Sequence, residues 1–274
     1  MLKESAVRQP DLVTFDPGTP RQSVRSQNFQ LEWVEVKPGE PPLELSSAVE
    51  TMLIVLDCTA KIAGEGQNAA APRRSVAVLP PGSYRIDFGG AGRACVVSTE
   101  RKGAREPLNA KSYVIPNQRV APVGPAWART GDPRKIQIFD VDQVKAPADN
   151  PRIKMFQSAT ISINWVDYQG PRDRTALSPH SHSDLEQASL AAAGDFVHHL
   201  RVAWSNNANE WRDDDHMRAG SPSVLVIPPD VIHTTEGVGP GHHLLIDVFA
   251  PPRRDFIAKG WVANSGEYRD PQKG

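Results

Sequence analysis

The 274-residue chain is poor in cysteine, has no long hydrophobic run and carries no excess of charge of either sign. Its two cysteines, Cys58 and Cys95, lie in strand-like segments without the CxxC spacing of a zinc site, so we interpret both as small buried hydrophobic residues. The apolar runs MLIVL and VLVI are too short to span a bilayer, and residues 1–20 contain no apolar core of a signal peptide. We therefore expect a soluble, cytoplasmic protein without a membrane partner.

The 31 Lys and Arg residues nearly balance the 32 Asp and Glu residues, and no basic stretch is interleaved with aromatic side chains. A nucleic-acid partner is therefore not expected. Proline and glycine are abundant instead: 25 Pro and 20 Gly divide the chain into short runs rich in β-branched residues, among them MLIVL, SVAVL, ATISINWV and SVLVI. This punctuation indicates an all-β fold with minor, peripheral helix.

Two segments of the chain, residues 38–85 and 176–233, follow the same plan, which indicates an internal repeat. Each copy contains a strand-like run, SVAVL or SVLVI, then a Pro-Pro turn and a polar residue at a fixed distance beyond it. In this alignment four residues of the first copy correspond to four of the second: Leu43, Leu45, Glu50 and Arg85 to His180, His182, Gln187 and His233.

The repeat predicts two tandem β-barrels. Residues 1–110 would form a first barrel without metal ligands, residues 111–134 a linker rich in proline and glycine, and residues 135–274 a second barrel. We expect the strand-like segment 135–141 to open the second barrel, with an exchange into the first barrel as the alternative.

All eight histidines lie at or beyond position 180, so the first copy has none. His180 and His182 are two residues apart, which on a strand places both imidazoles on the same face. His233 follows Pro228-Pro229, where a tight turn would direct it to the same point. Three neutral imidazoles in one place suit zinc, iron, nickel, copper or manganese. The alternative is that the first two are surface residues and His233 an ordinary core histidine.

A fourth ligand is expected from Glu186 or Gln187, since neighbours on one strand face opposite ways. The alignment with Glu50 favours Gln187 and predicts that Glu186 faces away; Glu186 remains the alternative. An amide ligand leaves the double charge of the ion uncompensated, which favours an anionic, chelating substrate.

The same alignment places Glu50 beside Arg85 in the first barrel. A buried guanidinium needs a carboxylate partner. We therefore expect a Glu50–Arg85 ion pair packed by Leu43 and Leu45, with Arg85 turned to solvent as the alternative.

The remaining polar clusters give weaker indications. His198 and His199 must face opposite sides of one strand, so one of them could line a cavity. The others are interpreted as ordinary structure: Asp213, Asp214 and Asp215 as a solvated loop, His216, His242 and His243 as loop or strand-end residues without a spacing partner, and Trp204 and Trp211 as core packing or a pocket mouth.

The segments PHSHSDLEQASLAAAG and IPPDVIH, residues 179–194 and 227–233, resemble the two short motifs of the cupin superfamily. The first is similar to the family's HxH followed by an acidic or amide residue and a glycine. The second is similar to its P-x-G-x-x-H, with Asp230 in place of the usual glycine, a change expected to alter the turn without removing the histidine. The ending DVFAPPRRDF, residues 247–256, is similar to the close of many cupin domains.

The resemblance is to a bicupin and covers most of the chain. It implies two jelly-roll barrels in each chain of a homodimer, with one divalent transition metal (Fe, Zn, Ni or Mn) in the second barrel. It implies a metal-dependent enzyme acting on a small organic acid or aromatic compound, with dioxygenase chemistry, an oxidoreductase activity, as the most common precedent. Two alternatives stay open: a metal-dependent isomerase, epimerase or lyase, and a non-catalytic cupin that binds a small ligand. The general base is not identified by the sequence.

Overall fold

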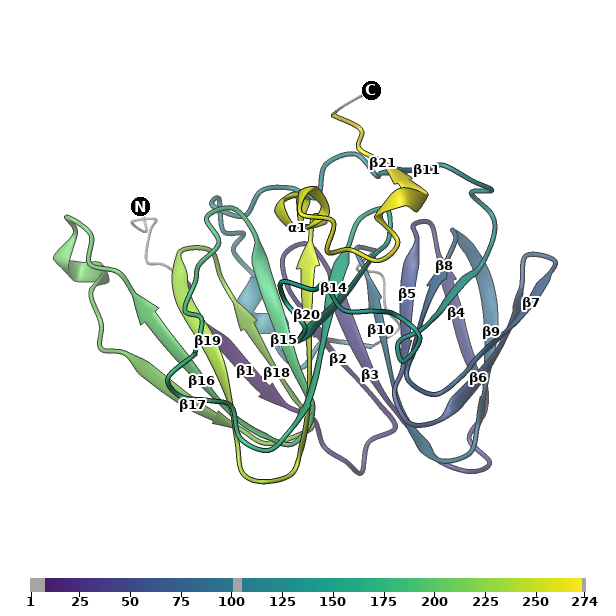
Figure 1. The fold of residues 1–274 in the computed structure, drawn as a ribbon, viewed down its shortest axis with the longest axis horizontal. Coiled ribbons are helices and arrows are strands. Elements are labelled where there is room, and N and C mark those ends of the chain that lie inside the picture. The colour runs from purple at the N-terminus through teal and green to yellow at the C-terminus, as the bar shows by residue number, and fades with distance from the viewer. Residues whose placement is uncertain (1–7, 101–104, 273–274) are drawn as a thin grey trace.

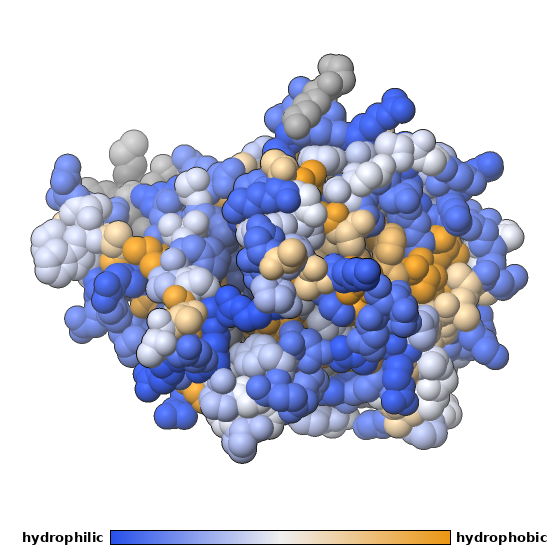
Figure 2. All heavy atoms as spheres, viewed as in Figure 1, coloured by the Kyte–Doolittle hydropathy of each residue, from blue (hydrophilic) through white to orange (hydrophobic). Residues whose placement is uncertain are grey.

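A computed structural model describes residues 8–100 and 105–272, and nearly all of their regular structure is strand (Figure 1). Two β-rich halves lie side by side, and each combines a six-stranded antiparallel sheet with a smaller sheet. The surface on the face shown is mostly hydrophilic, with hydrophobic residues gathered in small patches (Figure 2). Among the described residues no helix has the length and apolar character needed to cross a membrane.

The first half is built from two sheets. Its large sheet has the order β12-β8-β5-β10-β3-β2, with β2 at Arg21–Arg25, β3 at Gln30–Val36, β5 at Thr51–Val55, β8 at Ser75–Leu79, β10 at Gly92–Ser98 and β12 at Gln137–Asp140. Its small sheet has the order β4-β9-β6-β7, with β4 at Leu43–Ser47, β6 at Thr59–Gly64, β7 at Gln67–Ala71 and β9 at Gly82–Gly89.

The second half repeats this plan. Its large sheet has the order β1-β18-β15-β20-β14-β13, with β1 at Asp11–Thr14, β13 at Ile153–Gln157, β14 at Ser162–Gln169, β15 at Glu186–Ala193, β18 at Ser223–Ile227 and β20 at His242–Ala250. Its small sheet has the order β17-β16-β19, with β16 at Asp195–Val202, β17 at Asp215–Ala219 and β19 at Val231–Val238.

The short elements lie outside these four sheets. They are the two-stranded pair β11 (Ala128–Arg129) and β21 (Tyr268–Arg269), the helix α1 (Arg254–Ala258), and three 3-10 turns at Ala110–Tyr113, Ala208–Glu210 and Ser265–Glu267. Helix is therefore minor and peripheral, as the sequence predicts.

Each large sheet includes one edge strand that lies far away in the sequence from the other strands of that sheet. β12 pairs with β8, and β1 pairs with β18, so these two edge strands occupy equivalent places. The purple strand β1 accordingly lies among the green strands of the second half (Figure 1). The prediction that segment 135–141 opens the second barrel is wrong, because β12 satisfies the free backbone edge of β8 in the first. The boundaries 1–110 and 135–274 remain a prediction about folding units.

The main hydrophobic core lies between the two large sheets. β5, β8 and β18 are buried at every residue, since one face of each meets the opposite half and the other faces its own barrel. On β5, for example, Met52 and Ile54 pack between the halves, whereas Leu53 and Val55 face the first barrel. Burial on both faces explains why these strands are continuous apolar runs without alternation.

The interiors of the two barrels differ in polarity. The first is filled by apolar side chains, including Leu43, Leu53, Leu79 and Ile86. The second contains a cluster of buried polar residues: Gln187, Ser189, His233 and Asp247. Because buried polar groups are costly unless they are paired, the second barrel is the half whose interior requires a functional explanation.

The cross-strand registers correct the alignment of the two copies by one residue. Thr51 pairs with Leu79 and Gln187 pairs with Ile227, each partner lying just before its Pro-Pro turn. The counterpart of Gln187 is therefore Thr51, and Glu50 is the counterpart of Glu186. In the same way Leu43 pairs with Ile86, whereas His180 bridges to His233, so Ile86 and not Arg85 occupies the third histidine's place.

The predicted Glu50–Arg85 ion pair is wrong for this reason. The Arg85 side chain is exposed and pairs with Glu44 and Asp87, so the alternative that it faces solvent is confirmed. Glu50 is buried, and its carboxylate pairs with Arg129 instead. A one-residue shift on a strand moves a side chain to the opposite face, which accounts for both results.

Candidate metal centre

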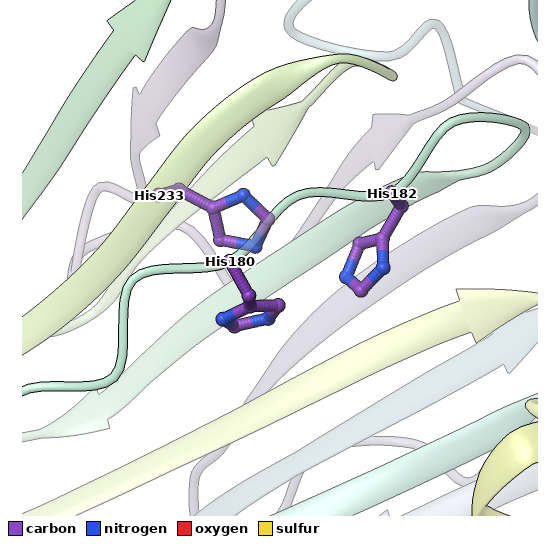
Figure 3. A group of neighbouring side chains, drawn as sticks. All are labelled: His180, His182 and His233. Carbon is purple, nitrogen blue, oxygen red and sulfur yellow. The ribbon is translucent and has the colours of Figure 1, made fainter.

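Three histidines converge inside the second barrel, as Figure 3 shows. One ring nitrogen of each, from His180, His182 and His233, lies within 4.8 Å of the others. The ring centroids of His180 and His233 are 4.4 Å apart, and His182 lies 5.1 and 5.3 Å from them. His233 is buried, His182 is partly buried and His180 is exposed, so the group lies between the barrel interior and solvent.

The local backbone brings the two motifs together. His180 and His233 exchange backbone hydrogen bonds of 3.1 and 2.8 Å, and the amide of Asp230 donates to the carbonyl of His182 at 2.6 Å. Asp230 has φ +64°, the left-handed conformation that favours glycine but that aspartate also tolerates. The turn after Pro228-Pro229 therefore forms without glycine, and Asp230 additionally pairs with Arg119 at 3.2 Å.

Backbone carbonyls orient two of the histidines, and burial keeps His182 and His233 neutral. Nδ1 of His180 lies 3.0 Å from the carbonyl of Ser178, and Nδ1 of His233 lies 2.8 Å from the carbonyl of Val231. A carbonyl only accepts, so each Nδ1 carries a proton, and in the neutral ring Nε2 carries the lone pair. Burial lowers the pKa of His182 to about 4 and that of His233 to about 3, so both stay neutral at physiological pH.

Gln187 completes the donor set. Its Nε2 donates to Ser189 at 2.8 Å and to Asp247 at 3.0 Å, which turns Oε1 toward the histidines. Oε1 lies 3.1 Å from Nε2 of both His182 and His233. In His233, whose Nδ1 donates to a carbonyl, Nε2 of the neutral ring is an acceptor like the amide oxygen, so the two atoms repel each other unless a cation lies between them. The arrangement therefore fits a metal ion with nitrogen and oxygen ligands.

Glu186 faces the other way, into the boundary between the halves. Its carboxylate accepts the backbone N–H of Gln27 at 2.6 Å and lies 3.7 Å from Nη1 of Arg8. Burial raises the pKa of Glu186. Of the two candidate fourth ligands, the structure thus brings Gln187 to the histidines and not Glu186, although metal ligation itself remains a prediction.

A cavity of about 430 Å³ opens beside the three histidines and Gln187. It is lined by further polar residues that the sequence analysis missed: Arg152, Tyr168, Arg172, Asp247, Arg253 and Lys259. Arg253 donates to both carboxylate oxygens of Asp255 and lies 3.4 Å from Nε2 of His182. Of these residues only Arg253 could have been identified as a cavity residue from the sequence, because it follows closely after the strand that ends at 250. The others come from loops and from β14 and β20.

The remaining histidines follow the strand alternation. His198 faces inward, is 1 % exposed and lies 2.9 Å from the hydroxyl of Thr235, but it does not line the cavity. His199 faces outward and contacts His216, a strand-end residue for which sequence spacing indicated no partner. Sequence spacing could not find this pair because it forms across β16 and β17.

The indoles of Trp204 and Trp211 stack on each other and are exposed, which corrects the core-packing interpretation.

No protein-family model and no curated protein matches the sequence. Solved structures do match the fold. AerE from Microcystis aeruginosa has a TM-score of 0.56 at 8 % identity, covering 89 % of this chain and 97 % of its own. Oxalate decarboxylase from Bacillus subtilis has a TM-score of 0.55 at 10 % identity, covering 83 % and 70 %. A putative glyoxylate-induced protein from Pseudomonas aeruginosa has a TM-score of 0.50 at 14 % identity, covering 83 % and 76 %.

The chain has the cupin fold. The predicted fold class, two tandem cupin-like barrels of β-strands, is confirmed by these neighbours. At such low identity the likeness concerns the fold alone. The second cupin barrel is the one whose polar interior and histidine triad could hold a metal ion.

We predict that Gln187→Glu keeps the metal and binds it more tightly, because a carboxylate would cancel half of the ion's charge. Glu186→Gln should leave metal affinity unchanged, since that side chain faces Gln27 and Arg8. Isothermal titration of Zn²⁺ into the two metal-free variants compares them directly. Loss of metal in Glu186→Gln alone would reassign the fourth ligand by one residue.

Proposed function

We propose that this protein is a metal-dependent enzyme acting on a small organic acid in the second cupin barrel. His180, His182, His233 and Gln187 would hold one divalent transition ion. The observation that carries the proposal is the convergence of the three histidine nitrogens within 4.8 Å of one another, with the Gln187 amide oxygen 3.1 Å from Nε2 of both His182 and His233. When bound, the ion would supply Lewis-acid polarisation of a carbonyl or carboxylate.

The donor set is neutral, which favours an anionic substrate. Three imidazoles and an amide bring no negative charge to a divalent ion, and the nearest carboxylate, Asp247, is occupied by Gln187 and Ser189. Asp247 is buried, and burial raises its pKa. Its part is to orient Gln187, because the bond from Nε2 keeps Oε1 directed at the histidines.

A pair of arginines on the cavity wall supports the same substrate class. Arg172 donates to the carbonyl of Thr235 at 2.7 Å and to Ser178 at 2.9 Å, and its Nε is buried without a partner. Burial and the neighbouring Arg152 lower the pKa of Arg172, and neither guanidinium forms an ion pair with a carboxylate among the described residues. Two like charges without a counter-ion form a site for a carboxylate, which Tyr168 on the same wall could also reach.

The reaction class that the neutral ligand set favours is a lyase or isomerase reaction of a carboxylic acid. Oxalate decarboxylase, which shares the fold, acts on a small diacid, in agreement with this class. A screen of small mono- and dicarboxylic acids, followed by mass spectrometry of products, release of carbon dioxide and oxygen uptake, tests it. Oxygen consumption would assign dioxygenase chemistry instead. Protein that is folded, binds the acids, but holds no metal under elemental analysis would assign a non-catalytic binding function.

We predict that Arg172→Met weakens binding of the acid that the screen identifies by roughly 10- to 100-fold, the loss expected for one charge-assisted hydrogen bond. The change should appear in KM, because the guanidinium holds a carboxylate that the reaction does not alter. Arg134→Met is the matched control, since the Arg134 side chain is 89 % exposed and remote from the cavity. Equal KM values for both variants would remove Arg172 from the substrate site.

A further inference from the structure

A pair of histidines outside the triad, His199 and His216, lies on the small sheet of the second barrel, whose strands β16 and β17 are at the left of Figure 1. β16 sends Phe196, His198 and Leu200 inward, where they are buried, and sends His199 outward. His216 on β17 is the direct cross-strand neighbour of His199. The two imidazoles therefore share one surface of the sheet.

The two rings approach each other through their Nδ1 atoms. Nδ1 of His199 lies 2.8 Å from Nδ1 of His216, and the rings are edge to face with centroids 4.9 Å apart. Two ligand nitrogens bound at about 2.0–2.1 Å to one ion are about 2.9 Å apart when the angle between them is 90°. The observed separation is that of neighbouring ligands in a square-planar or octahedral ion, the geometry of Cu²⁺ and Ni²⁺.

Glu236 on β19 fixes the tautomer that a metal ion requires. Its carboxylate lies 2.9 Å from Nε2 of His199 and 3.1 Å from Nε of Arg174, and its side chain is 7 % exposed. A carboxylate only accepts, so Nε2 of His199 carries the proton and Nδ1 carries the lone pair. Metal-binding histidines typically donate their second ring nitrogen to a carboxylate in this way.

The surface in front of the pair is open to further ligands. A depression of about 620 Å³ is lined by His199, His216, Glu236, Arg174 and Arg218, among others. It also contains Asp214, whose carboxylate is held by Arg201 at 2.8 and 2.5 Å. Water or a small anion could take the remaining ligand positions.

We propose that His199 and His216 form a second metal site, outside the barrel, that binds a divalent transition ion with Glu236 as the positioning residue. The site shares no residue with the triad of the barrel, so the two proposals can fail separately. The probes are Zn²⁺ and Cu²⁺ alone, added to tag-free, metal-free full-length protein.

The test is a stoichiometry experiment with four proteins. Cu²⁺ titration should give two ions per chain in the wild type, one in His182→Ala, one in His216→Gln and none in the protein with both substitutions. His242→Gln is the matched control, because His242 is also an exposed histidine paired with a carboxylate, Asp167, while its neighbour His243 is buried against Tyr168. It should keep two ions.

Two further measurements identify the ligands. His182→Ala protein with one equivalent of Cu²⁺ should show superhyperfine coupling to two nitrogens in its electron paramagnetic resonance spectrum, and the protein that also carries His216→Gln should lack it. Glu236→Gln should keep the stoichiometry but weaken the outer site by roughly 10- to 100-fold. The proposal is overturned if His216→Gln still binds as many ions as the wild type, or if the copper spectrum of His182→Ala lacks the two nitrogens. Loss of an ion in His216→Gln but not in His182→Ala would instead overturn the barrel site.

Discussion

Replacing His182 by alanine is expected to lower the metal affinity of the second barrel by more than 100-fold and to abolish turnover of the acid substrate. Loss of a partner outside the ligand set already costs roughly 10- to 100-fold, and His182 is one of only three imidazoles in the set. Because its side chain is only partly buried, the barrel should stay folded without it. Zn²⁺ titration in a His216→Gln background, where the outer pair cannot contribute, isolates this site.

Two controls separate ligation from folding. His242→Ala removes an exposed histidine that pairs with Asp167, and it should change neither metal content nor activity. Unfolding curves of the metal-free proteins should coincide for wild type and His182→Ala, since the substitution removes a ligand and little packing. If His182→Ala retains its metal and its activity, the triad is not the catalytic centre; if it unfolds, the residue is structural.

The fold was predictable because it depends on local patterns that a single sequence displays. The Pro-Pro turns after SVAVL and SVLVI occur in both halves, each followed by a polar residue at the same distance, and each turn ends a strand in the structure. The HxH spacing and the turn before His233 predicted the triad in the same way, since both act over a few residues. Asp230 confirms the physical basis, because it adopts the positive φ that the motif requires without being glycine.

The alignment of the two copies could not be fixed to a single residue from the sequence. Loops of different length separate the strands in the two copies. The segments 43–50 and 180–187 have equal length in the sequence, but in the sheets the residue equivalent to Gln187 is Thr51 and not Glu50. Gln187 faces the histidines as predicted, but the reason given for it was incorrect: Glu50 corresponds to Glu186. Strand register depends on backbone partners far away in the chain, which a single sequence does not display.

The corrected alignment reveals a shared function for the two glutamates. Glu50 accepts the backbone N–H of Ala159 at 2.7 Å, and Glu186 accepts that of Gln27 at 2.6 Å. Each acceptor therefore holds a turn that belongs to the opposite half, and each has an arginine beside it, Arg129 or Arg8. Together with the exchanged strands β1 and β12, these contacts tie the two barrels to each other.

Breaking the Glu50–Arg129 ion pair is expected to be the most destabilising single change outside the hydrophobic core. The two side chains are 6 % and 3 % exposed, and the carboxylate also accepts from the Tyr268 hydroxyl at 2.9 Å. Glu50→Gln would leave the Arg129 guanidinium buried without a counter-charge, at a cost of about 3–5 kcal/mol in unfolding free energy. Urea denaturation of the single variants and of the double variant Glu50→Gln/Arg129→Met measures it.

The double variant should lose less stability than Glu50→Gln alone, because it removes the uncompensated charge together with its partner. The exposed pair Glu44–Arg85 provides the matched control: its side chains are 70 % and 55 % exposed, and Glu44→Gln should cost about 1 kcal/mol or less. The two pairs join the same residue types but differ in burial and in their other partners, since Glu50 also accepts from Tyr268 and Ala159 whereas Arg85 keeps Asp87. Additive losses at Glu50 and Arg129, or equal losses at Glu50 and Glu44, would show that the buried pair does not hold the two halves together.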